Sequence, residues 1–300
     1  MSPAPYALKP CLTDLLALRH AVGNPGVRVG LSGGTRTGRH RSSATGRGLE
    51  FAGLRPYQPG DDPRSLDWRH TARRGRPFTK VFHEERDRPV LILADIGPTM
   101  HFGTRGVFKG VQAARAAALL AWSAAAEGDQ IGGVVRMCGG LRDVPHQGRD
   151  RGALNLIHTL TAPEDAEGET APSLSAAVAR LQRHLRPGCE VFVISDFATL
   201  DESVERALHA LRRAQRLTLL RIADPLELAA PPPGIYRIED EGGALEYDLR
   251  GAAARDAYDA ACQARTTQLA GLGRNLAAQV LTLATHTPAT TLPALQRCHR

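Results

Sequence analysis

The sequence has few aromatic residues, which make up 5% of its 300 positions, and only three methionines. Its five cysteines are scattered without a close pair of the kind that zinc sites use, so no zinc site is predicted. The longest apolar segment, residues 111–126, is interrupted by Gln112 and Arg115. Because it is shorter than the roughly 20 residues that a membrane span needs, no transmembrane helix is predicted.

Motifs for targeting and for ATP hydrolysis are also missing. The N-terminus, Met-Ser-Pro-Ala-Pro-Tyr, lacks the charged and apolar regions of a signal peptide, which favours a cytoplasmic location. No Gly-x-x-x-x-Gly-Lys-Ser/Thr loop is present. The chain is therefore not expected to hydrolyse ATP.

Positive charge is in excess and unevenly distributed. Lysine and arginine number 38 against 31 acidic residues, which leaves a net charge of +7. Residues 15–49 contain six arginines and no acid, a pattern that fits a surface for nucleic acid or an acidic partner, or a solvated loop. Since no aromatic residue lies among these arginines, stacking on single-stranded bases is not expected. Phosphate contacts by residues 28–47 stay an alternative.

Residues 88–103 organise the rest of the chain. Val90–Ala94 are all apolar without polar alternation, the pattern of a buried strand that helices cover on both faces in a parallel α/β sheet. The strand ends on Asp95, and Gly97-Pro98 prevent it from continuing. Asp95 is thus predicted at the carboxyl end of the sheet, where ligands bind in such folds.

The later sequence continues in α/β order, with a second strand, 190–195, that ends on Asp196. Two stretches at 234–249 flank Asp-Glu-Gly-Gly and predict a hairpin inserted before the last long helix. The other expected strands are 131–137, 217–223 and 279–284, with a short return strand at 141–144. The expected helices are 106–126, 150–160, 174–185, 201–214, 251–272 and 292–298.

The N-terminal part has a different pattern. Residues 11–21 have helical spacing, and 25–88 predict a small β-rich layer with strands at 27–31, 49–57 and 78–84. Residues 32–48 have almost nothing to bury and predict a mobile loop. We therefore expect an N-terminal helix (1–24), a β-rich subdomain (25–88) and an α/β domain (89–300).

The block Phe-Ala-Gly-Leu-Arg-Pro-Tyr-Gln-Pro-Gly-Asp-Asp-Pro-Arg-Ser-Leu-Asp-Trp at 51–68, followed by Thr71-Ala-Arg73 and Glu84-Glu85, resembles the signature of the domain-of-unknown-function 58 family. The resemblance covers roughly residues 25–285. It implies a von Willebrand A-like doubly wound, mostly parallel sheet, and a MoxR-type AAA+ ATPase as partner. It also implies a structural or interaction role for the signature residues Arg55, Tyr57, Gly60, Asp61, Asp62, Arg64, Asp67, Trp68 and Arg73.

The two strand ends suggest a metal site. If strands 90–95 and 190–195 are neighbours, Asp95 and Asp196 meet in one crevice with Thr99 between them, and such oxygen ligands suit Mg²⁺. The resemblance implies the same site, because the von Willebrand A pattern reads Asp-x-Ser-x-Ser with a Thr and an Asp from later loops. Asp95, Thr99 and Asp196 match that pattern.

Gly97 departs from the pattern because it has no hydroxyl. The later Thr is not clearly matched either by Thr170 or by Ser173 or Ser175. We therefore expect a degenerate site that binds Mg²⁺ weakly. The alternative is that Asp95 caps a helix or pairs with an arginine.

The function predicted from these patterns is a non-enzymatic cytoplasmic adaptor that partners a MoxR-type AAA+ ATPase in assembling or activating other proteins. One alternative is a metal-dependent phosphohydrolase that uses Asp95 and Asp196, although Gly97 replaces the general acid of an Asp-x-Asp-x-Thr motif. The other alternative is nucleic-acid binding through the basic loop. Among the dispersed histidines only His101, six residues after Asp95, stays a candidate.

Overall fold

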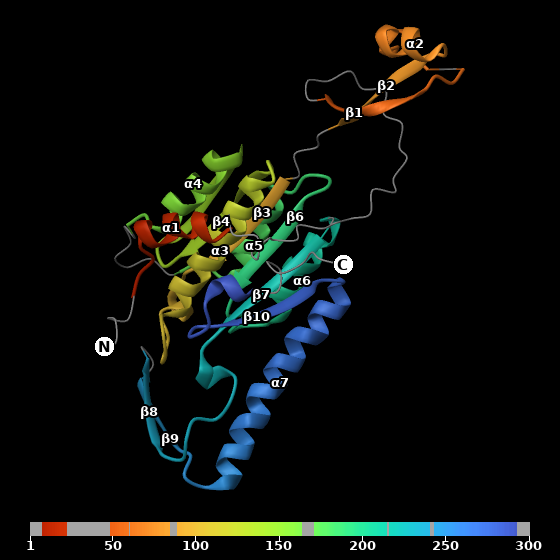
Figure 1. The fold of residues 1–300 in the computed structure, drawn as a ribbon. Coiled ribbons are helices and arrows are strands. Elements are labelled where there is room, and N and C mark those ends of the chain that lie inside the picture. The colour runs from red at the N-terminus through yellow and green to blue at the C-terminus, as the bar shows by residue number, and fades with distance from the viewer. Residues whose placement is uncertain are drawn as a thin grey trace. The chain divides into compact units, whose positions relative to one another are not determined.

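The computed structural model describes residues 8–22, 49–59, 61–84, 89–163, 171–214, 216–240 and 243–292 (Figure 1). Its contacts divide the chain into two compact units: residues 1–33 with 88–300, and residues 34–87. The predicted strand 27–31 and loop 32–48 lie outside the described residues, as does nearly all of the predicted helix 292–298.

The larger unit is built on one six-stranded sheet with the order β10-β7-β6-β3-β4-β5 (Figure 1). Every neighbouring pair is parallel except β4 and β5. The predicted von Willebrand A-like doubly wound, mostly parallel sheet is thus confirmed, and the strand order reverses at β3. The strands are β3 (Pro89–Asp95), β4 (Gln130–Met137), β5 (Gly140–Gly148), β6 (Glu190–Ser195), β7 (Arg216–Ala223) and β10 (Gln279–Ala284).

Helices cover both faces of this sheet, as the unbroken apolar run of β3 predicts. Val90, Ile92 and Ala94 pack into one core cluster, whereas Leu91 and Leu93 pack into the other. The first cluster is completed by α1 (Leu12–Val22), α3 (Lys109–Ala126) and α4 (Arg149–Leu160). The second is completed by α5 (Leu174–Gln182), α6 (Glu202–Ala210) and α7 (Ala252–Leu276). No helix in the described part of the chain is long and apolar enough to cross a bilayer.

Several predicted boundaries were wrong: α3 begins at Lys109 rather than 106, α5 ends at Gln182 rather than 185, and α6 ends at Ala210 rather than 214. The return strand β5 spans residues 140–148, not 141–144, because its pairing with β4 extends as far as Gln130 opposite Gly148. Helix α7 continues past Leu272 to Leu276. Gly273 lies inside this helix and does not end it. Its lack of a side chain makes room for Val280, whose Cγ2 lies 2.3 Å from where a Cβ would be.

The predicted hairpin is present as β8 (Ile235–Asp240) and β9 (Gly243–Asp248). In the smaller unit, β1 (Leu49–Pro56) pairs antiparallel with β2 (Phe78–Glu84). Between them lies α2 (Trp68–Arg74), which the sequence analysis missed. Its signals were present: Asp67 caps its start, and Gly75 ends it with φ of 67°.

His146 on β5 leads to a prediction about pH. Its Nε2 lies 3.2 Å from the His184 carbonyl oxygen, and its buried Nδ1 has no hydrogen-bond partner among the described residues. Burial lowers the pKa of His146 below its ordinary value, so the unfolded chain takes up this proton at a higher pH than the folded chain does. We expect the free energy of unfolding to fall between about pH 7.5 and about pH 5.

The measurement is urea denaturation across this range for the parent protein and for His146→Gln, which should show a flatter profile. The neighbouring Asp143 stays ionised throughout, because its hydrogen bond from Arg180 lowers its pKa to about 2. Identical pH profiles for the two proteins would contradict the assignment.

Candidate functional site

The strand ends that were predicted to form a crevice, those of β3 and β6, lie side by side. Ala94 pairs with Ile194 in parallel register, so Asp95 and Ser195 follow at the same edge of the sheet. Asp196 comes next, and both carboxylates are buried, that of Asp95 with 1% of its surface exposed. The expectation that the two strands are neighbours is confirmed.

The Asp95 carboxylate accepts three hydrogen bonds. Oδ1 accepts from the Gly97 amide at 3.0 Å and from Nη1 of Arg136 at 2.7 Å. Oδ2 accepts from the Ser195 hydroxyl at 2.7 Å. The carboxylate is therefore held by one cation and two neutral donors.

Arg136 reaches Asp95 because the two are register partners on β4 and β3. The other edge of its guanidinium is also held, since Nε donates to the Pro172 carbonyl oxygen at 2.6 Å. Pro172 directly precedes Ser173, which caps α5. The arginine thus connects the end of β3 to the loop that leads into α5.

Asp196 is paired with a second buried cation. The ammonium of Lys109, the first residue of α3, donates to Oδ2 of Asp196 at 2.7 Å and to Oε1 of Glu227 at 2.9 Å. Oδ1 of Asp196 accepts from the Ala198 amide at 3.0 Å. Lys109 therefore joins the start of α3 to the ends of β6 and β7.

The third carboxylate at this edge, Asp224 after β7, is fully buried and has neutral partners. Its oxygens accept from the amide and hydroxyl of Thr104 at 2.7 and 2.6 Å, and from the Thr285 hydroxyl at 3.1 Å. It also caps a short 3-10 helix by accepting from the Leu226 amide. Its role is to tie three loops together.

The other predicted metal ligands are placed differently. Thr99 is exposed on a short 3-10 helix, Pro98–Met100. Ser173 accepts from the Ala176 amide and contacts Ser175 Oγ at 2.9 Å, while Thr170 lies outside the described residues. Within the described part of the chain, no three Asp, Glu, His or Cys side chains are grouped as a metal would need.

As arranged, these residues do not fit a magnesium ion, because an arginine and a lysine contact the oxygens that would face it. Magnesium binding itself stays a prediction. The sequence analysis missed Arg136, Lys109 and Glu227. The available signals were an arginine inside the apolar strand 131–137 and one of only three lysines at the start of an apolar helix.

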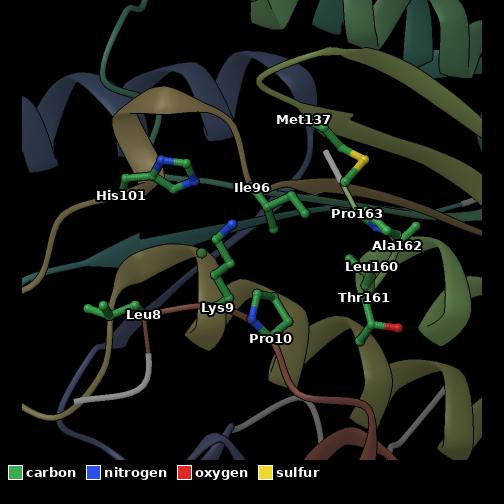
Figure 2. A pocket seen from close by; sticks show the side chains of 11 residues that line it. Leu8, Lys9, Pro10, Ile96, His101, Met137, Leu160, Thr161, Ala162 and Pro163 are labelled. Carbon is green, nitrogen blue, oxygen red and sulfur yellow. The ribbon is translucent and has the colours of Figure 1, made fainter. Parts of the chain in front are cut away.

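His101 lines a pocket of about 110 Å³ (Figure 2). Its walls come from Leu8–Pro10, before α1, and Leu160–Pro163, at the end of α4, together with Ile96 and Met137. Among the described residues, the lining is mostly apolar and contains no carboxylate.

The signature residues divide into two groups in the smaller unit. The acids organise its backbone: Asp61 accepts from Arg55 at 2.6 Å and from the Gln58 amide, Asp62 caps a 3-10 helix, and Asp67 caps α2. The backbone amide of Tyr57 donates a hydrogen bond to the Pro77 carbonyl oxygen and so extends the β1–β2 pairing. Gly60 lies outside the described residues. Trp68, Arg64 and Arg73 are exposed.

Comparison with known proteins gives one family. The family model described as "Protein of unknown function DUF58" matches residues 53–268. Uncharacterized protein Rv1480 of Mycobacterium tuberculosis is 26% identical over 253 residues, 84% of this chain and 80% of that protein. Uncharacterized protein YeaD of Bacillus subtilis is 38% identical over 66 residues, 22% of this chain and 15% of that protein.

Solved structures with a similar fold include an aerotolerance-related membrane protein from Bacteroides fragilis. It has a TM-score of 0.45 and 15% identity, and the match covers 69% of this chain and 98% of that chain. A von Willebrand factor type A protein from Catenulispora acidiphila has a TM-score of 0.30 and 16% identity, with 49% of this chain and 35% of that chain covered.

Proposed function

The chain belongs to the DUF58 family, whose function is unknown. We propose that it is a non-enzymatic adaptor that binds other proteins through the signature block around helix α2. As partner we propose a MoxR-type AAA+ ATPase, which this chain would assist in assembling or activating client proteins in the cytoplasm. The binding surface is the exposed signature face, which consists of Trp68 and the arginines Arg64, Arg69 and Arg73.

The observation that carries this proposal is the exposure of Trp68. An indole with 69% of its surface exposed has little stabilising role in the folded chain, since it buries little apolar area. Tryptophan and arginine are the residues most enriched in the energetic centres of protein interfaces. Trp68 therefore supplies an apolar anchor for a partner.

Charge on the signature face indicates the chemistry of that partner. Residues 63–77 contain five arginines and one acid, Asp67, whose carboxylate is used to cap α2. Within the described residues no acid forms an ion pair with Arg64, Arg69 or Arg73. An acidic partner surface with a pocket for the indole would complement both features.

The burial of the Asp95 and Asp196 carboxylates supports a non-catalytic role. A nucleophile or general base needs an accessible oxygen, but the carboxylates of Asp95 and Asp196 are each occupied by a cation and a backbone amide. No specific observation favours the phosphohydrolase alternative. The basic loop of the nucleic-acid alternative lies outside the described residues.

Replacement of Trp68 by alanine is expected to weaken binding to a purified MoxR-type ATPase about 30-fold or more, equivalent to about 2 kcal/mol. The melting temperature of the variant should stay near that of the parent, because the side chain is exposed. Isothermal titration calorimetry and a thermal melt on the full-length chain make the two measurements.

Leu154→Ala is the matched control, since Leu154 on α4 is a second large apolar residue with 44% of its surface exposed. It should bind the ATPase like the parent. Equal binding by Trp68→Ala would contradict the proposal. If the parent instead bound duplex DNA, with an affinity that falls steeply as salt rises, the nucleic-acid alternative would be favoured over the adaptor.

A further inference from the structure

We propose that the Arg136 guanidinium takes the place of a metal ion in the crevice, where it links the end of β3 to the loop before α5 and makes the site independent of metal. This role of Arg136 does not depend on the proposed partner.

The hydrogen bonds of Asp95 leave little room for an ion. A carboxylate offers about four acceptor positions, and three are already used by Arg136, Ser195 and the Gly97 amide. The guanidinium sits 2.7 Å from Oδ1 and is itself buried. A divalent cation on this oxygen would have to displace the arginine, because two like charges at contact distance repel strongly in a buried site.

The arginine makes the same kind of connection that an ion would make. A bound metal joins loops by collecting an oxygen from each of them. Arg136 collects a carboxylate oxygen of Asp95 through Nη1 and the carbonyl oxygen of Pro172 through Nε. The metal-site pattern predicts a later hydroxyl ligand in the Pro172 loop, but the Ser173 hydroxyl in this loop caps α5.

Gly97 fits this arrangement. Its φ of −70° is accessible to any residue, so backbone strain does not require glycine here. Space does, because a Cβ would lie 2.7 Å from Nη1 of Arg136 and 3.3 Å from Oδ1 of Asp95. The guanidinium cannot easily move away, since hydrogen bonds hold both of its edges. Gly97, which lacks the hydroxyl of the metal-site pattern, therefore lies next to the guanidinium that takes the place of the metal.

Asp196, the other carboxylate of the predicted metal site, is also paired with a buried cation. Lys109 has 3% of its surface exposed, and its ammonium lies within 3 Å of oxygens of both Asp196 and Glu227. Each acid of the predicted site therefore has its own side-chain cation. A divalent ion would find both acids already neutralised.

The test uses Mn²⁺, which reports its own binding by electron paramagnetic resonance, on the full-length chain. The parent protein is expected to bind no Mn²⁺ that Asp95→Asn removes. Arg136→Met removes the charge while keeping similar bulk, and is expected to bind one equivalent of Mn²⁺. Adding Asp95→Asn to that variant should abolish the binding. Mg²⁺ should raise the melting temperature of Arg136→Met more than sodium chloride of equal ionic strength does.

Two results would overturn the proposal: a Mn²⁺ site in the parent that depends on Asp95, or a folded Arg136→Met protein that gains no Mn²⁺ site. If Arg136→Met does not fold, Arg136→Gln gives the same comparison, because it removes the charge but keeps an N–H donor. The parent measurement decides independently of either variant. Arg115→Met, which breaks a partly exposed ion pair with Asp14, is the control and should gain no Mn²⁺ site.

Discussion

Lys109→Met is expected to lower the free energy of unfolding by about 3–5 kcal/mol, the usual cost of removing one partner of a buried ion pair. The lysine ammonium is the only cation within hydrogen-bonding distance of Asp196 in the described part of the chain, and it also holds Glu227. Without it the buried Asp196 carboxylate keeps a single donor, the Ala198 amide. Because Lys109 connects α3 to two strand ends, the loss should affect the whole larger unit.

Urea denaturation at neutral pH measures this loss as a shift of the transition midpoint. The matched control is Arg115→Met, because Arg115 contacts Asp14 at the same 2.7 Å but both side chains are partly exposed. Such a pair contributes about 0–1 kcal/mol. If the two variants lost similar stability, burial would not be what makes Lys109 important. A Lys109→Met protein as stable as the parent would show that Asp196 does not need its cation.

Gly133→Ala is expected to prevent stable folding, with a loss above about 4 kcal/mol. Gly133 lies in β4 with φ of 157°, and its backbone packs directly against β3. A Cβ there would lie 1.9 Å from the Ile92 carbonyl oxygen, a backbone atom that cannot move without breaking the pairing of the two strands. Since β3 and β4 carry Asp95 and Arg136, the crevice would be lost with the sheet.

Circular dichroism and urea denaturation measure this effect. Gly148→Ala is the control, because Gly148 ends the neighbouring strand β5 and a Cβ there meets no atom within 4 Å. It should change the stability by less than about 1 kcal/mol. A Gly133→Ala protein with parental stability would mean that β3 and β4 are spaced differently from the structure described above.

Much of the larger unit follows from local patterns. The apolar run of Val90–Ala94 predicted a buried central strand, and its residues do alternate between the two core clusters. The same reasoning predicted that Asp95 and Asp196 end neighbouring strands. These predictions succeed because burial on both faces removes polar residues from a strand, and that signal is contained in a few consecutive positions.

The helix α2 was missed although its caps are in the sequence. Its seven residues are too few to show a helical period, and none of them is buried. A hydrophobic pattern therefore could not reveal it. The Asp67 and Gly75 caps were the only local signals, and they are recognised more easily once the flanking strands are known.

The chemistry of the crevice was decided by the tertiary structure. Local sequence placed two carboxylates at the sheet edge and led to the expectation of magnesium, but it did not show which cation lies beside them. Arg136 is 41 residues from Asp95, and Lys109 is 87 residues from Asp196. Each pair forms because strand register and helix packing bring distant positions within 2.7 Å, and one residue of slip in β4 would turn Arg136 to the opposite face of the sheet.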